Sequence, residues 1–338
     1  MTAMRSFFVA LFGLAMAPFA GHAEPAKLLF ATTSSPDIAL VQKVFNPWAA
    51  QVTAASGGTL DIEVRNGTTI ADAKNYYDRV TSDVAQIAFG MEGLIGNRFP
   101  LSAAAGLPYA IEPQDAVAAS VALWRLYKSG MMHKEYGDLK PVMLAVLPPS
   151  FLHFVKPPKS IEETVGMKLI SSGKERSELV ERLGYAPISA PTADMYSMLQ
   201  RGGAAGVVGA WPSFTTFKLQ EVTLYHLEVP LGSSTSIVFM TAKRFAALPP
   251  QARKAIDDNA TEAQSRHFGE VWQATADEAR STTEKMPGQV FGHLDPQTAK
   301  KWQNEAEAVL DEWSQATPGG KEILAKFRAL LAEVKAGR

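Results

Sequence analysis

The stretch from Gly166 to Trp211 constrains the fold of this chain more than any other part of the sequence. Its spacing of apolar residues predicts a strand at 167–170, a helix at 174–183, a strand at 186–189 and a helix at 193–201, and a Gly/Ala/Val run then predicts a buried strand. Strands joined by crossover helices lie parallel in one sheet. The sequence therefore predicts an α/β fold, with a largely parallel sheet in the lobe that holds this stretch.

The first 23 residues have the pattern of a secretory signal peptide. One positive charge, Arg5, precedes an apolar run at 7–19, and we expect cleavage after Ala23. That run and every later apolar run are shorter than the ~18 residues that a spanning helix needs. We therefore expect a soluble, exported protein.

Composition narrows the function classes. The chain has no cysteine, which excludes disulfides, Cys-ligated zinc and iron–sulfur clusters. It has 33 Lys and Arg against 34 Asp and Glu; loss of the signal peptide leaves 33 − 1 = 32 against 34, so nucleic acid is not an expected partner. The six histidines show no metal-binding spacing, and the motifs of a phosphate cradle or a nucleophile elbow are absent. We expect no metal, no cofactor and no enzymatic activity.

The mature length of about 315 residues exceeds one hydrophobic core and predicts two lobes. In the first lobe, a helix from Ser35 to about Gly57 should be kinked by Pro47. The remaining elements expected there are strands at 27–33, 60–65, 84–91 and 142–147, and helices at 72–82 and 114–128.

Later segments should connect the lobes. The stretch 151–155 is expected to cross into the second lobe, and a strand at 236–241 to return to the first. Residues 249–285 predict a single helix ~55 Å long, either straight or bent, because they contain no proline beyond its start. Two closing helices follow, the first of them capped by Asp295. The expected division is a signal peptide at 1–23, lobe one at 24–147 plus 236–275, and lobe two at 148–235 plus 276–338.

The order of short motifs resembles that of a known family. In the second lobe the matching residues are Gly166, Lys168, Leu183, Gly184, Pro187, Tyr196, Leu199, Gln200 and Gly206; in the first they are Ile87-Ala88-Phe89 and Leu107-Pro108-Tyr109. Together these resemble the DctP-type solute receptors of tripartite ATP-independent periplasmic (TRAP) transporters. The resemblance implies a two-lobe periplasmic binding protein fold, with a long spine helix linking the lobes and the ligand held between them.

Two positions depart from the family pattern. Ile170 stands where the family has an arginine that pairs the ligand carboxylate, and Ala205 stands where it has an aspartate. Carboxylate ligands usually recruit arginine, because its planar fork can pair both oxygens. The family therefore does not fix the ligand of this chain.

Transfer of the family's pocket gives a set of candidate binding residues. They are Thr33, Met91, Leu94, Ser150, Ile170, Thr192, Gly209 and, nearby, Trp211. Trp211 fits equally a cleft wall that stacks on the ligand or a core residue. Glu92 could meet an amine ligand, although a surface role is the simpler interpretation.

A relocated cation could replace the missing arginine. The candidates are His153 and Lys174, both close to Ile170 in the sequence. Lys174 and Arg176 begin a helix after Gly173, where the helix dipole disfavours cations unless an anion lies nearby. This is a hint of anion binding, although solvated or capping side chains would explain the same residues.

The expected function is the periplasmic solute-binding subunit of a TRAP transporter. It would capture a small organic acid by hinge closure of the lobes near 148–151 and 230–236 and, as a monomer, deliver it to the membrane permease. The alternatives are a receptor for a neutral, aromatic or amine solute, a sensing protein on the same fold, and a secreted enzyme.

Overall fold

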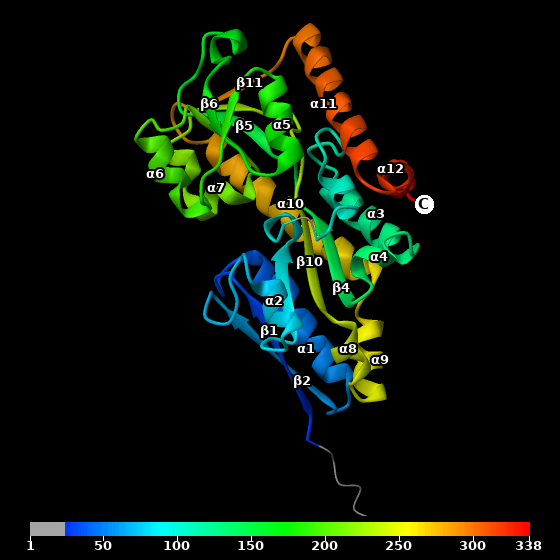
Figure 1. Ribbon diagram of the computed structural model, residues 1–338. Coiled ribbons are helices and arrows are strands. Elements are labelled where there is room, and N and C mark those ends of the chain that lie inside the picture. The colour runs from blue at the N-terminus through cyan, green and yellow to red at the C-terminus, as the bar shows by residue number, and fades with distance from the viewer. Residues whose placement is uncertain (1–23, 97) are drawn as a thin grey trace, which may run out of the picture.

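The computed structural model describes residues 24–96 and 98–338, and it folds into two lobes, each built on its own sheet (Figure 1). The expected signal peptide lies outside the described residues. Helices cover the sheets, so the predicted α/β class and two-lobe architecture are confirmed. No helix in the described ranges combines the length and the apolar character needed to cross a bilayer.

The first sheet has five strands in the order β2-β1-β3-β10-β4. Their bounds are β1 Ala26–Thr32, β2 Leu60–Asn66, β3 Ile87–Met91, β4 Leu139–Val146 and β10 Thr235–Thr241. The first three strands are parallel, and β10 pairs antiparallel with both β3 and β4. The strand expected at 236–241 therefore does return to the first sheet.

The second sheet has the order β11-β9-β5-β8-β6-β7. Its strands are β5 Phe151–Phe154, β6 Lys168–Ile170, β7 Ala186–Ile188, β8 Gly206–Gly209, β9 Tyr225–Leu227 and β11 Val290–Gly292. Strands β6, β7 and β8 are parallel, as the repeated strand–helix pattern predicts. In contrast, β5 is antiparallel to both of its neighbours, so the sheet is mixed.

Helices join these strands. The α-helices nearest the first sheet are α1 Asn46–Ala55, α2 Tyr76–Thr81, α3 Ala116–Lys128, α4 His133–Tyr136, α8 Ala242–Ala246 and α9 Pro250–Asp258. Those of the second lobe are α5 Lys174–Arg182, α6 Met195–Gln200 and α7 Pro212–Phe217. The expected irregularity at Pro47 is a π-helical turn, Val41–Phe45, that leads into α1.

Two extended segments cross side by side between the lobes. The Leu147 amide donates to Ser234 O (2.9 Å), the Ser150 amide to Gly232 O (2.8 Å), and the Leu231 amide to Ser150 O (2.9 Å). These bonds continue the β4–β10 pairing beyond the first sheet. The two crossings therefore form one hydrogen-bonded ribbon at the junction.

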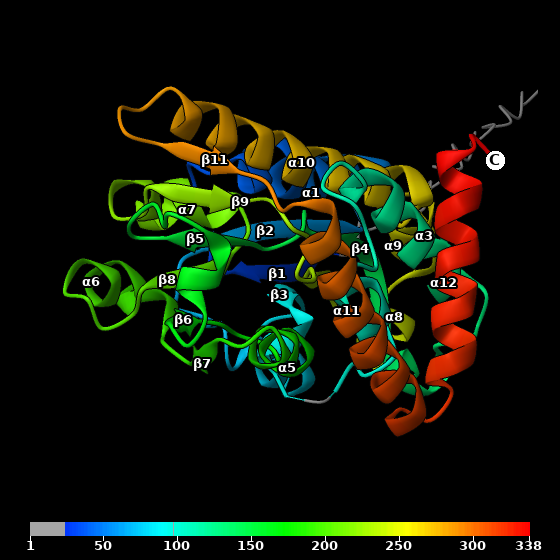
Figure 2. The same cartoon turned by 90° about the horizontal axis from the view of Figure 1, so that it is seen from above.

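The spine is shorter than the sequence predicts. Instead of one helix over 249–285, α9 ends at Asp258 and α10 runs over Glu262–Glu284, 23 residues or ~34 Å. Thr261 starts α10 as its N-cap, since its side chain accepts from the Gln264 amide. Trp48 Nε1 donates a hydrogen bond to the Asn259 carbonyl (3.0 Å), and this bond stabilises the break between α9 and α10. Even so, α10 passes from α3 in the first lobe to α7 in the second (Figures 1 and 2).

The C-terminal helices differ from the expected placement. α11, Pro296–Ala316, begins in the second lobe, where Trp302 belongs to the core cluster of that lobe, but its end at Trp313 joins the core of the first. α12, Gly320–Lys335, packs beside α3 (Figure 2). The assignment of all of 276–338 to lobe two is therefore wrong for α12, because the apolar stripe of this helix faces the first lobe.

Phe327 tests this placement of α12. Its ring is fully buried in the first-lobe core, so Phe327→Ala should lower the free energy of unfolding by ~3–5 kcal/mol in urea titrations. The neighbouring Arg328→Ala removes only an exposed ion pair to Glu307 and should cost less than ~1 kcal/mol. Equal, small losses would show that α12 is not docked in the core.

Candidate ligand-binding cleft

Strand register decides which strand ends face the junction in the second lobe. β5 starts at Phe151, immediately after the first crossing, and Phe151 lies opposite Gly209, the last residue of β8. β6 runs parallel to β8, so its last residue, Ile170, lies toward the same edge. The carboxyl ends of β6 and β8 therefore face the first lobe.

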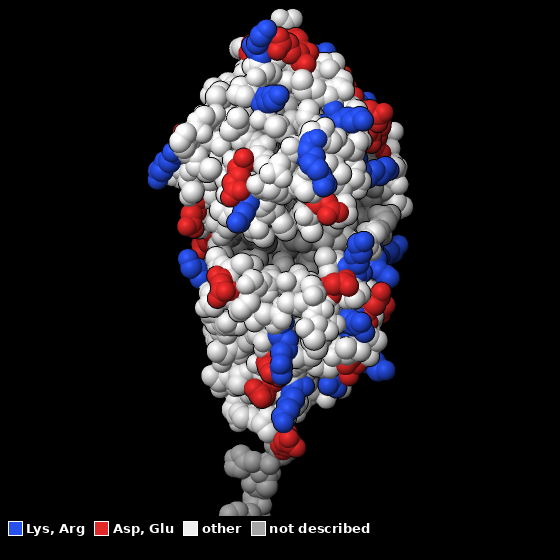
Figure 3. Space-filling view, turned by 90° about the vertical axis from the view of Figure 1, so that its left-hand side faces the viewer, with Lys and Arg blue, Asp and Glu red and all other residues white. Residues whose placement is uncertain are grey.

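The same argument applies to the first lobe. β10 starts at Thr235, directly after the second crossing, and the neighbouring Ser236 lies opposite Met91, the last residue of β3. β1 is parallel to β3, so Thr32 and Thr33 follow toward the same edge. Carboxyl ends of parallel strands are the usual ligand-binding edges of α/β sheets. The molecular surface is hollowed across the middle, between the two halves (Figure 3).

The candidate residues separate into two groups. Thr33 and Met91 are half-buried at the first-lobe edge, and Gly209 is half-buried at the second-lobe edge. Lys174 and Thr192 are exposed, while Leu94 is 52 % exposed beside Tyr77 and Arg98. The remaining candidates, Ser150, His153, Ile170 and Trp211, are buried.

Ile170 does not line the cleft as expected. Its side chain is 0 % exposed and belongs to a core cluster with Phe151, Leu199 and Val207. Since the position is apolar, it packs inward on its own lobe. The Ile170 side chain is thus enclosed by its own lobe.

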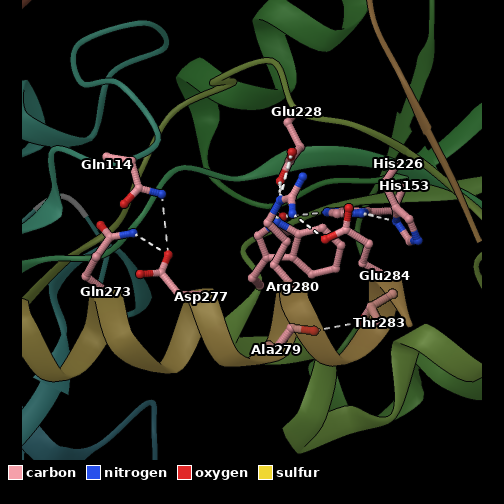
Figure 4. Close-up of polar contacts among 12 residues, drawn as sticks. Gln114, His153, His226, Glu228, Gln273, Asp277, Ala279, Arg280, Thr283 and Glu284 are labelled. Atoms are coloured by element: carbon pink, nitrogen blue, oxygen red, sulfur yellow. Dashed lines mark hydrogen bonds and ion pairs between the residues drawn. The ribbon is translucent and has the colours of Figure 1, made fainter. Parts of the chain in front are cut away.

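Trp211 and His153 are also buried in the second lobe, and Figure 4 shows His153 beside His226. His153 Nε2 lies 3.0 Å from Gly209 O, and its Nδ1 lies 2.8 Å from Nδ1 of His226. Burial and the neighbouring His226 hold the pKa of His153 well below its usual value. The idea that His153 replaces the missing cation is therefore wrong, and Trp211 is a core residue rather than a cleft wall.

Trp211 is connected to the spine helix α10 through hydrogen bonds to Glu228. Trp211 Nε1 donates to Glu228 Oε1 (2.9 Å), and Arg280 on α10 donates to the same carboxylate (2.9 Å). One turn earlier, Asp277 accepts from Gln114 of the first lobe (3.4 Å). Figure 4 shows α10 presenting these side chains in sequence, so a single stretch of the spine is bonded to both lobes.

Arg176, which the sequence analysis did not place among the binding residues, lies at the junction. It sits in the first turn of α5, just after the carboxyl end of β6, and donates to Ser172 O (3.1 Å) and to Ser233 O of the second crossing (2.7 Å). Its buried Nε has no partner within the described chain. The signal in the sequence was the pair of cations after Gly173, but only the structure shows which of them is buried.

Glu92 is a buried acid at the end of β3. Its Oε1 accepts from Tyr136 Oη (2.5 Å), and Tyr136 is linked through Ser102 to a second acid, Glu135. Burial raises the pKa of Glu92 to about 8 and that of Glu135 to about 7. Burial therefore favours the neutral form of Glu92 at pH 7, and it contradicts the surface role that the sequence suggested for this residue.

The described residues hold no group of three or more His, Cys, Asp or Glu side chains arranged for a metal ion. The polar groups that the described residues bring to the junction include the Ser150 hydroxyl, the backbone carbonyls of the crossings, the acid Glu92 and the Arg176 guanidinium. Such a set can bind a small organic molecule by hydrogen bonds and a single charge.

Comparison with known proteins identifies the family. Residues 30–316 match the family described as bacterial extracellular solute-binding protein, family 7 (DctP). The chain belongs to this family. A relative from Comamonas testosteroni, the outer membrane transporter protein TsaT, is 27 % identical over 257 residues, which are 74 % of this chain and 75 % of the relative.

Solved structures agree with this family assignment. A TRAP solute-binding protein from Rhodoferax ferrireducens, in complex with copurified benzoate, is 25 % identical over 93 % of this chain and 100 % of its own, with a TM-score of 0.82. A Bordetella bronchiseptica TRAP protein with bound mandelate is 22 % identical, with a TM-score of 0.79. The match covers 92 % of this chain and 100 % of that protein's chain. The prediction of a TRAP solute-binding subunit is confirmed, and such subunits work with membrane permease components.

Ile170→Arg tests whether this position faces the core. A guanidinium there would be buried without a partner, so we expect a loss of ~3–5 kcal/mol in the free energy of unfolding. The control Ile170→Val should cost ~0.5–1.5 kcal/mol. If the arginine variant stays within ~1 kcal/mol of wild type, the side chain faces solvent or the cleft.

Glu92→Gln tests the buried acid. The pKa of Glu92 is raised from 4.5 to about 8 on folding, so the native state holds a proton that the unfolded chain loses, and stability falls as pH rises through this window. The slope is at most ~1.4 kcal/mol per pH unit. The amide variant should lose the Glu92 part of that slope, keep the part due to Glu135, and exceed wild type in stability near pH 8, measured by urea unfolding from pH 5 to 8. Exposed Glu181→Gln is the control; an unchanged slope in Glu92→Gln would contradict the assignment.

Proposed function

We propose that this receptor binds a small monocarboxylic acid carrying an aromatic ring, of the benzoate type. The observation that carries the proposal is the likeness to the Rhodoferax ferrireducens protein, which covers nearly all of both chains and was obtained with benzoate. The proposal extends the family assignment to a class of ligand.

The chemistry of the cleft edges supports a ligand with few polar groups. Met91 is apolar at the first-lobe edge, Gly209 is small at the second-lobe edge, and Ile170 at the end of β6 offers no charge. A sugar acid or a dicarboxylate would need several charged or amide partners, because each buried polar group left without one costs free energy. A ring with one carboxylate needs only one such partner.

Closure of the lobes would complete the site. The two crossings and the segment beside them are joined by backbone bonds, including Ser233 N to Gly106 O (2.8 Å) and Tyr109 N to Pro230 O (2.9 Å). A ribbon of this kind can absorb small rotations while its ends stay paired, which is how hinged receptors close. The candidate residues at both edges would then meet on one ligand.

The proposed role includes the location, the oligomeric state and the lobe division of the protein. The protein acts in the periplasm as a monomer after removal of residues 1–23, and it releases its ligand chemically unchanged to the permease. The lobes divide at the crossings near Pro148 and Thr235, with α12 added to the first lobe.

A ligand screen tests the proposed class. Benzoate should raise the unfolding temperature of the mature protein, because a ligand at ~100 times its Kd adds ~2.7 kcal/mol to the free energy of unfolding. Benzamide, the matched neutral compound, should have a much smaller effect. Small-angle scattering should show a smaller radius of gyration with benzoate. Stabilisation by amines or neutral aromatics, with none by acids, would overturn the proposal.

A further inference from the structure

The proposed acid ligand needs a cation, and the described junction offers one in an unusual state. Arg176 is half-buried as a residue, but its Nε atom lies beneath the surface. Both of its hydrogen-bond partners are neutral backbone carbonyls, Ser172 O and Ser233 O. Its sequence neighbour Glu175 is the acid whose charge acts on it, yet no carboxylate of the described residues forms an ion pair with it.

A buried guanidinium without a counter-ion is energetically costly. Burial lowers the pKa of Arg176 to about 10, so the group still carries its charge at neutral pH. Desolvation of such a charge costs several kcal/mol unless a counter-ion and further hydrogen bonds offset it. Two other arginines, by contrast, have carboxylate partners: Arg182 of α5 pairs with Glu178 and Glu312, and Arg280 of α10 pairs with Glu228.

The direction of the side chain places the charge at the cleft edge. Side chains in a helix point toward its N-terminus, so a first-turn residue reaches back over the loop that precedes the helix. Arg176 does this, since it contacts Ser172, and it then reaches the crossing at Ser233. The loop 171–173 follows the carboxyl end of β6, which faces the first lobe.

We infer that Arg176 is the carboxylate-binding residue of this receptor, taking over from the arginine that Ile170 replaces. The unpartnered Nε and the backbone amides at the start of α5 bind one carboxylate of the ligand. Because Arg176 also holds Ser233, the anion contacts a residue that touches the hinge ribbon itself, which links ligand charge to lobe closure. Exposed Lys174 has no such contact. This inference rests on the proposed function.

The primary test compares benzoate affinity among four proteins by calorimetry. Arg176→Gln should weaken benzoate binding by ~30-fold or more, because it removes the charged partner of a buried carboxylate. Arg176→Lys, which keeps the charge, should lose less. Arg182→Gln, on the same helix but far from the cleft edge, is the matched control and should stay within about threefold of wild type.

A second measurement separates ligand contact from a structural role. The side-chain Nε–H resonance of Arg176, assigned by its absence in Arg176→Lys, should shift when benzoate is added. An unmoved resonance would overturn the inference even if Arg176→Gln bound poorly, since it would mark the arginine as a tether between α5 and the crossing. This measurement uses wild type and needs no folded glutamine variant.

The two proposals fail in different ways. If wild type binds benzoate and Arg176→Gln binds it equally well, the assignment of Arg176 is wrong while the proposed ligand class stands. If wild type binds no acid in the screen, both are overturned.

Discussion

The hydrogen-bonded ribbon between the lobes is the constraint on which the rest of the structure depends. Leu147 and Ser150 pair with the segment 231–234, so the two crossings cannot move apart independently. Close approach is possible because Gly232 adopts φ +107°, and a Cβ there would lie 2.8 Å from Gly106 O. This pairing fixes which end of each central strand faces the junction, and hence where a ligand can bind.

The sequence predicted most helices and strands, because their apolar residues recur at a clear spacing. It could not predict which element each of them packs against. The sequence did not predict the break between α9 and α10. Asn259 and Thr261 can both occur inside a helix, and only the capping contacts of the folded structure favour a break there. The apolar stripe of α12 was visible, yet a stripe states only that a face is buried. Which lobe buries it depends on tertiary packing.

For the candidate site, the sequence predicted the positions of several strand ends, but it did not predict which side chains are buried. Thr33, Met91 and Gly209 do lie at the facing edges. Ile170 and Trp211 turn into the core, because an apolar residue at a strand end gains more from packing than from a polar cleft. Alternation along a strand as short as β6 does not reveal which face is covered.

The two buried ionisable groups near the junction respond to burial in opposite ways. Glu92 can become neutral by taking up a proton, and its hydrogen bond from Tyr136 then needs no counter-ion. Arg176 keeps its charge near neutral pH despite a lowered pKa. The first lobe thus presents a neutral acid and the second a positive charge. A single negative charge would complete this junction, which agrees with the proposed acid ligand.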